Sequence, residues 1–313
     1  MPQHVLITGG SGLIGTRLTE LLRQQGYSVA HLSRPNSNRS ATPTGVRVHE
    51  WDVAKGELDE RALPEADYLI HLAGAGIADE RWTESRKKEI IDSRVESTRL
   101  LARKLKAAGR QSTAHPLKAF LSASAIGVYG ADTGGRILTE SSAPGRDFLA
   151  DVTLRWEAAA EEVAQLGIRT VKMRTGIVLS EKGGALAKIA QPIRLGAGAA
   201  LGSGRQILSW IHLDDLARLF IYAMEDETMR GAYNAVAPNP VTNDQLTKLA
   251  ADALGKPLWL PRVPAFALRL AFGEMAAVVL GGNHVLNGRV AKETDFTYRF
   301  TDAREALENL LKE

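Results

Sequence analysis

Glycines at a regular spacing near the N-terminus are the first residues whose pattern indicates chemistry. The run Thr8-Gly9-Gly10-Ser11-Gly12-Leu13-Ile14-Gly15 follows an apolar segment, residues 4–8, and opens an amphipathic one, residues 13–25. Between a strand and a helix, such a run leaves backbone amides free at the positive end of the helix dipole, where a pyrophosphate binds. A tight turn without a ligand would use the same glycines. Its place at the start of a βαβ unit favours a dinucleotide site made of Gly9, Gly10, Ser11, Gly12, Leu13, Ile14 and Gly15.

The residues after the second predicted strand discriminate between the two nicotinamide dinucleotides. An acidic side chain there would bind the ribose of NAD through hydrogen bonds. This chain has Ser33 and Arg34 instead. A hydroxyl beside a guanidinium binds a 2′-phosphate through charge-assisted hydrogen bonds, whereas a carboxylate would repel it. We therefore expect NADP(H) to be the cofactor.

Two later strand ends provide further candidates for the cofactor site. Asp52 ends the third predicted strand, where it meets an adenine edge or, as an alternative, caps a loop. Leu72, Ala73 and Gly74 end the fourth strand, and small residues there leave room for the ribose and the pyrophosphate.

Apolar runs that alternate with amphipathic stretches predict the elements that position these residues. Strands are expected at residues 5–8, 27–32, 46–51, 67–73, 118–124 and 169–174, and helices at 13–25, 83–108 and 149–166. This alternation is typical of an α/β fold, a Rossmann doubly wound parallel sheet with helices on both faces. After residue 174 the rhythm breaks, and prolines separate helices in a smaller, mostly helical lobe. We expect residues 1–178, with 207–235 returning to them, to form the NADP-binding domain, and residues 179–206 and 236–313 to form the substrate lobe.

Composition excludes several classes of function. The 313 residues contain no cysteine, which removes disulfides, thiolate metal sites and cysteine nucleophiles. The net charge is only +3 and the two signs are interspersed, so we expect no nucleic-acid partner. No apolar run approaches the length of a bilayer span and no signal peptide is recognisable, so we expect no membrane partner and a cytoplasmic location.

Seven motifs give the chain a resemblance to the extended short-chain dehydrogenase/reductases, which include the nucleotide-sugar epimerases and dehydratases. They are TGGSGLIG from residue 8, IADERWT from 77, IDSR from 91, SASAIGVYG from 122, RTGIVLS from 174, GSGRQ from 202 and SWIHLDDLA from 209. The chain most resembles an atypical, epimerase-like subgroup that ends in its own small C-terminal domain. The resemblance implies NADP binding and a pocket closed by the C-terminal lobe. It also implies that Glu89 and Arg94 face the cofactor and that Val178 touches its nicotinamide end; a surface ion pair on the helix is the alternative for Glu89 and Arg94.

The expected catalytic pair is missing. That superfamily uses a Tyr and, four residues later, a Lys on one helix; counting back from Glu157, these positions hold Leu149 and Thr153. Reduction of a carbonyl leaves an alkoxide that must be protonated, so an enzyme needs another acid. Tyr129 is the candidate, and Ser122 and Ser124 are candidates for binding a substrate oxygen. In the alternative interpretation Tyr129 only lines the pocket and the serines satisfy backbone groups at the strand end.

Other polar residues predict a substrate-facing wall but no metal. His212 and Asp214-Asp215 have no third ligand at a suitable spacing, and Asp215 suits the first turn of a helix. Cations and aromatic rings that would suit a planar or anionic ligand, or else would pack between the lobes, are Arg81, Trp82, Arg205 and Trp210.

The sequence thus predicts an NADP(H)-dependent oxidoreductase or epimerase-like enzyme that acts on a small polar substrate. A catalytically silent NADP(H)-binding redox sensor or scaffold is the alternative. A nucleotide-sugar epimerase with a displaced acid is the third hypothesis. By analogy with the superfamily we expect a homodimer.

Overall fold

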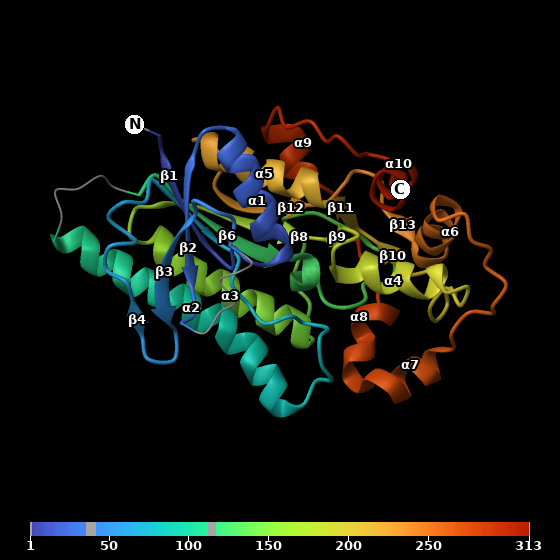
Figure 1. Cartoon of the computed structure of the whole chain (residues 1–313). Coiled ribbons are helices and arrows are strands. Elements are labelled where there is room, and N and C mark those ends of the chain that lie inside the picture. The colour runs from blue at the N-terminus through green and yellow to red at the C-terminus, as the bar shows by residue number, and fades with distance from the viewer. Residues whose placement is uncertain (1, 36–41, 112–116, 313) are drawn as a thin grey trace.

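A large sheet forms the centre of the computed structural model, which describes residues 2–35, 42–111 and 117–312 (Figure 1). Its strand order is β12-β8-β6-β5-β1-β2-β3-β4, and all neighbouring pairs are parallel except β3 and β4. The strands are β1 (His4–Thr8), β2 (Ser28–Ser33), β3 (Arg47–Asp52), β4 (Glu57–Leu58), β5 (Tyr68–His71), β6 (Ala119–Ala125), β8 (Arg169–Thr175) and β12 (Gly231–Ala235). The six strands predicted from the sequence are confirmed, with ends that differ by one or two residues.

Helices cover both faces of this sheet. On one face α1 (Leu13–Gln24) packs with α5 (Leu213–Glu225), and their apolar side chains share a core with β1 and β8. On the other face α2 (Glu84–Gln111) packs with α3 (Phe148–Ala164) over a second core. Apolar strands buried on both faces are typical of a doubly wound sheet. The α/β Rossmann prediction is therefore confirmed.

The direction of the chain reverses between β1 and β5. After β1 the chain passes to β2 and β3 on one side, and it then returns to place β5 on the other side of β1. Thr8 pairs with His71 at the carboxyl ends of these two strands. In open α/β sheets ligands bind at such a switch point, so the glycine run lies where a ligand is expected.

The last part of the chain builds a smaller, mostly helical region beside the sheet (Figure 1). Its third core joins apolar residues of α4 (Gly184–Arg194), α6 (Asn243–Ala253) and α10 (Ala303–Leu311). Val290 instead belongs to the core of the main sheet, so α9 (Gly288–Glu293) packs against β12. Among the described residues, no helix combines the length and apolar character needed to span a membrane. The elements outside the main sheet and its four helices are η2 (Ile126–Tyr129), β7 (Ile137–Leu138), β9 (Ile177–Leu179), α4 (Gly184–Arg194), β10 (Ile207–Leu208), β11 (Trp210–His212), β13 (Val241–Thr242), α6 (Asn243–Ala253), α7 (Ala265–Phe272), η3 (Gly273–Ala276), α8 (Ala277–Leu280), β14 (His284–Val285), α9 (Gly288–Glu293) and α10 (Ala303–Leu311).

Candidate functional site

The turn between β1 and α1 can be built only with glycine at several positions. Gly9 has a φ of 68°, and a Cβ there would lie 3.0 Å from the backbone carbon of Leu72. A Cβ at Gly15 would lie 2.3 Å from the carbonyl oxygen of Gly9, far inside van der Waals contact. The absence of these side chains lets the first turn of α1 rest directly on the loop.

The N-terminus of α1 is open to a ligand. Gly12 is the N-cap and supplies no side-chain hydrogen bond, and the first turn contains no acidic residue. The Gly12 amide donates to the Gly9 carbonyl at 3.0 Å, which closes the turn, while Thr16 makes the first helical bond back to Gly12. The amides of Leu13 and Ile14 precede that bond and have no partner within the helix. Free amides at a helix start fit a diphosphate.

Buried polar side chains hold the floor of this turn. The hydroxyl oxygen of Thr8 accepts from the amides of Leu72 and Ala73, at 3.1 and 3.2 Å, and lies 2.6 Å from Nδ1 of His71. Burial lowers the pKa of His71 to about 3, and the nearby Arg94 adds to this effect. A neutral imidazole therefore fixes the carboxyl ends of β1 and β5 relative to each other. The structure thus brings Leu72 and Ala73 directly under Gly9.

His31 provides a second support that sequence reasoning missed. A Cβ at Gly10 would lie 2.5 Å from its ring atoms, so the loop rests on the imidazole. His31 is completely buried, its Nε2 lies 2.8 Å from the Thr19 hydroxyl, and burial lowers its pKa to about 4. A histidine inside an apolar strand indicates burial, but nothing in the sequence shows that it would pack under Gly10.

Arg94 lies beside Gly74 and has no carboxylate partner among the described residues. A Cβ at Gly74 would lie 3.1 Å from the Arg94 guanidinium carbon, which stands 5.2 Å from the Trp156 ring centre. Burial, and then the charge of Arg86, lower the pKa of Arg94 to about 10. A half-buried cation without a carboxylate partner favours a negatively charged or strongly polar ligand at this edge.

The family resemblance predicts that Glu89, like Arg94, faces the cofactor, but Glu89 lies in more exposed surroundings than Arg94. Its carboxylate pairs with Arg86 at 2.7 Å and its side chain is 58% exposed, which is the helix ion pair that was the alternative. Arg86 also donates to the carbonyl of Gly76 at 2.7 Å and thereby fixes the loop after β5. Contact between Glu89 and a cofactor stays a prediction.

The end of the sheet beyond β2 offers room for the far end of a dinucleotide. Ser33 ends β2, and Arg34 is exposed without an ion pair to any described residue. A hollow of about 500 Å³ next to them is lined by Pro35, Trp51 and Asp52, among others. Asp52 also accepts a hydrogen bond from the amide of Lys55 at 3.1 Å, so it caps the loop and lines the hollow. Arg39, a second arginine that would assist in binding a 2′-phosphate or else is only solvated, lies outside the described residues.

Val178 meets the opposite side of the glycine run. Gly184 lies between Leu13 and Val178: a Cβ there would lie 3.7 Å from the Leu13 side chain and 3.6 Å from the Val178 carbonyl oxygen. The structure therefore brings two predicted cofactor residues from β9 and α1 to one place.

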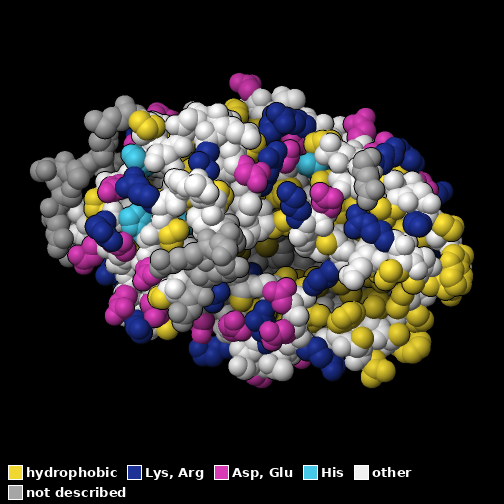
Figure 2. All heavy atoms as spheres, viewed as in Figure 1, with side chains coloured by type: hydrophobic (Ala, Val, Ile, Leu, Met, Phe, Trp, Pro, Cys, Tyr) yellow, Lys and Arg dark blue, Asp and Glu magenta, His cyan; other side chains and the backbone are white. Residues whose placement is uncertain are grey.

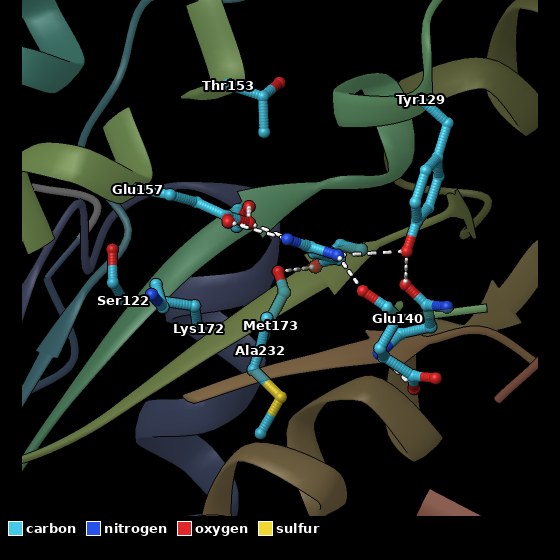
Figure 3. A network of polar contacts seen from close by, with 12 residues as sticks. Ser122, Tyr129, Glu140, Thr153, Glu157, Lys172, Met173 and Ala232 are labelled. Atoms are coloured by element: carbon cyan, nitrogen blue, oxygen red, sulfur yellow. Dashed lines mark hydrogen bonds and ion pairs between the residues drawn. The ribbon is translucent and has the colours of Figure 1, made fainter. Parts of the chain in front are cut away.

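The candidate catalytic residue Tyr129 belongs to a buried polar network (Figure 3), and Ser124 donates to a carboxylate of the same network. Arg174 binds Glu157 through two hydrogen bonds of 2.8 and 2.9 Å and donates to the Tyr129 hydroxyl at 3.1 Å. Tyr129 donates to Asn234 at 2.8 Å, and Ser124 donates to Glu157 at 2.6 Å. Burial raises the pKa of Tyr129, whereas the bonds from Arg174 hold that of Glu157 below its usual range even though burial opposes this. Both hydroxyl protons are thus already engaged inside the protein.

Ser122 and the two positions on α3 lie apart from this network. Ser122 is 1% exposed and donates to the carbonyl of Ala123. Thr153 donates to the carbonyl of Leu149, and both residues lie about 3.5 Å from the place of a Cβ at Gly127 in η2. Leu149 and Thr153 therefore face the loop after β6, and neither carries an ionisable group.

Of the predicted substrate residues, Arg81 contacts the C-terminal region, where it donates to the carbonyl of Leu270 at 3.2 Å. The Trp82 ring lies 4.8 Å from that of Phe148, the first residue of α3. Arg205 is exposed. The prediction that Trp210 faces a substrate is wrong. Its side chain is 0% exposed, donates to the carbonyl of Asn239 and belongs to the third core, so it cannot form a wall of a cleft.

The described residues contain no group of three or more histidine, aspartate or glutamate side chains arranged to hold a metal ion. His212 is the N-cap of α5 and accepts from the amide of Asp214, and its ring stacks on Phe300. Asp215 lies in the first turn and accepts from the amides of Arg299 and Phe300. These residues hold the last segment of the chain.

Comparison with known proteins gives matches along nearly the whole chain. Residues 5–235 match the NAD dependent epimerase/dehydratase family, and residues 263–310 match a domain of unknown function, DUF1731. The epimerase family protein YfhF of Bacillus subtilis is 36% identical over 308 residues, which cover 98% of each chain. The epimerase family protein SDR39U1 of Mus musculus is 36% identical over 311 residues, 98% of this chain and 99% of that protein.

Solved structures show the same likeness. The crystal structure of human epimerase family protein SDR39U1 (isoform 2) with NADPH has a TM-score of 0.85 and 33% identity, and 99% of both chains is covered. UDP-glucose 4-epimerase of Thermotoga maritima, solved with UDP-glucose, has a TM-score of 0.78 at 20% identity, covering 99% of this chain and 97% of that one. The second likeness shows a shared fold alone.

Proposed function

The chain belongs to the NAD dependent epimerase/dehydratase family, and on that premise we propose that it is an NADP(H)-dependent oxidoreductase or epimerase-like enzyme. Its substrate is a small polar molecule held between the sheet and the C-terminal region. The observation that carries the proposal is the open N-terminus of α1, which meets the glycine turn at the switch point of the sheet. A human relative solved with NADPH supports the choice of cofactor.

Each part of the proposed cofactor has residues of suitable chemistry. The amides of the Gly9–Gly15 turn bind the diphosphate, and the small residues Ala73 and Gly74, which follow Leu72, leave it space. Ser33 and Arg34 bind the 2′-phosphate, and Asp52 lines the adenine hollow. Arg94 supplies positive charge beside Gly74, and Val178 contacts the nicotinamide end. Bound NADP(H) would supply or accept the hydride.

Proton transfer to the substrate needs an acid from the chain itself. Leu149 and Thr153 cannot ionise usefully, which leaves Tyr129, Ser122 and Ser124 as the predicted polar groups. Tyr129 can act as the acid only if its hydroxyl leaves Asn234, to which it donates at 2.8 Å. Otherwise Tyr129 is a positioning residue that orients Arg174 and the strands around it.

The second candidate function is a catalytically silent NADP(H)-binding sensor or scaffold. One observation favours it: the hydroxyls of Ser122, Ser124 and Tyr129 all donate to partners within the protein. Both functions need the same cofactor site, so they differ only in turnover.

Turnover separates the two candidates. The purified protein is mixed with NADPH and a panel of carbonyl compounds, and the loss of NADPH absorbance is followed. Nucleotide sugars are incubated with the protein and NADP+ and are then separated by chromatography, because an epimerisation leaves the cofactor unchanged overall. The enzyme hypothesis predicts NADPH oxidation or a rearranged sugar for one class of substrate; neither across the panel, with NADPH still bound, supports the silent protein. Once a substrate is found, the variant Tyr129→Phe tests the acid. If Tyr129 is the acid, this variant has no turnover, while its affinity for NADPH is unchanged. Retained turnover removes Tyr129 from proton transfer.

A further inference from the structure

The segment before α7 and α7 itself expose large apolar side chains that the core does not use. Leu195, Trp259, Phe266 and Leu270 are each 70 to 78% exposed, and Leu258 and Phe272 are each 37% exposed. Within α7 only Leu268 is buried. Single exposed apolar residues are ordinary, but a contiguous group of this size marks an interaction site.

These side chains come from segments that lie side by side. Val263 exchanges hydrogen bonds with the loop after α4: its amide donates to Ala200 and its carbonyl accepts from Gly202, both at 2.9 Å. Leu258 packs where a Cβ on Gly198 would lie, 2.9 Å away. Figure 2 shows hydrophobic side chains gathered over α7 and the segment that leads to it, at the lower right of this face. We call the exposed side chains of residues 194–205 and 254–273 the α7 patch.

The charged side chains within the α7 patch are all basic, and Glu274 directly after it, 67% exposed, pairs with Lys87. Residues 194–205 and 254–273 contain five basic residues and no aspartate or glutamate. These are Arg194, Arg205, Lys256, Arg262 and Arg269, all of them exposed. Arg262 pairs with Asp244 of α6 at its edge. Arg269 lies on α7 between Phe266 and Phe272 and has no ion pair with any described residue.

Exposed apolar side chains together with basic ones favour a lipid surface over a second copy of the chain as the partner of the α7 patch. A twofold interface centred on α7 would bring Arg269 of one copy toward Arg269 of the other and bury both without an anion, at a large desolvation cost. An anionic bilayer offers headgroup charge to the arginines and acyl chains to the aromatic and leucine side chains, as interfacial helices use them. From this complementarity we propose that the α7 patch docks the protein onto anionic lipid bilayers without spanning them. This surface departs from the sequence-based expectation of no membrane partner.

Vesicle co-sedimentation of the full chain tests the proposal. The probes are phosphatidylcholine vesicles with and without phosphatidylglycerol, each at low and high salt. The wild-type protein binds the anionic vesicles, and added salt weakens this binding because surface charge is screened. The double variant Phe266→Ser/Leu270→Ser lowers the bound fraction at least about tenfold, and Arg269→Ala raises the apparent Kd about fivefold. Ile137→Ser is the matched control, since Ile137 is 62% exposed on β7, outside the α7 patch.

Two further measurements exclude trivial explanations. The altered residues are exposed, so the thermal midpoint and the affinity for NADPH stay at wild-type values. Wild-type protein that stays in solution with anionic vesicles overturns the proposal, as does equal binding by the double variant. Light scattering without vesicles measures whether the protein is a dimer. If the wild-type protein is a dimer and the double variant is a monomer, the α7 patch is an interface between two copies and the lipid proposal is wrong.

Discussion

Replacing Gly15 by alanine inserts one methyl group between α1 and the glycine turn. The new Cβ would lie 2.3 Å from the Gly9 carbonyl oxygen, 2.6 Å from Gly10 Cα and 2.9 Å from the Gly10 carbonyl carbon. All three atoms belong to the backbone, so the turn must move by about 1 Å to restore ordinary contact distances. Overpacking of this kind costs about 1–3 kcal/mol, against a gain of about 1 kcal/mol in helix propensity. The free energy of unfolding should therefore change by no more than about 2 kcal/mol.

The affinity for NADPH should change much more than the stability. A shift of the turn misdirects the amides that face the diphosphate, and each charge-assisted hydrogen bond contributes about 1.5–3 kcal/mol. Loss of one such bond raises the Kd at least about tenfold. Gly109→Ala is the matched control, because Gly109 also lies within a helix and a Cβ there meets no atom within 4 Å. Titration calorimetry measures both variants; wild-type affinity in a folded Gly15→Ala protein would refute the role given to the turn.

Three further perturbations test other parts of the site. Arg34→Ala should raise the Kd of NADPH about tenfold to a hundredfold and that of NADH less than about threefold, measured by titration of each cofactor, and an equal loss for both contradicts 2′-phosphate binding. Glu157→Gln leaves the Arg174 guanidinium without its carboxylate and should lower the free energy of unfolding by about 3 kcal/mol in urea titrations, whereas Glu162→Gln on the exposed side of α3 should change it little. In the folded protein the pKa values of His31 and His71 are about 4 and about 3, against 6.5 ordinarily, so the unfolded chain takes up protons first as the pH falls below 6.5. Each histidine should therefore cost about 2 kcal/mol of stability at about pH 5, and urea titrations giving the same stability at about pH 7.5 and pH 5 would show that these side chains are not buried in the neutral form.

Local sequence pattern was enough to predict the sheet and the glycine turn. Alternating apolar and amphipathic stretches placed β1 to β3, β5, β6 and β8 within one or two residues, because burial on both faces requires such runs. The spacing of Gly9, Gly12 and Gly15 likewise identified the turn, since their effect depends on neighbours only a few residues away.

The contacts that support the site could not be read from the sequence. His71 meets Thr8 across 63 residues, and Arg174 meets Glu157 only because β8 lies beside β6 and under α3. Such pairings depend on strand order, which no single segment encodes. Trp210 was predicted to be part of a substrate wall because cationic residues lie near it in the sequence. In the structure its ring is buried in the third core instead. The exposure of the apolar side chains of α7 could not be predicted, because their sequence pattern resembles that of a buried helix.

Calorimetric titration of the wild-type protein with NADPH and, separately, with NADH measures whether the glycine turn and the end of β2 form an NADP(H) site. We expect saturable binding at one site per chain, tighter for NADPH by at least about tenfold because of Ser33 and Arg34. Equal affinities would contradict the assignment of the β2 end, and no heat with either dinucleotide would contradict the site at the N-terminus of α1.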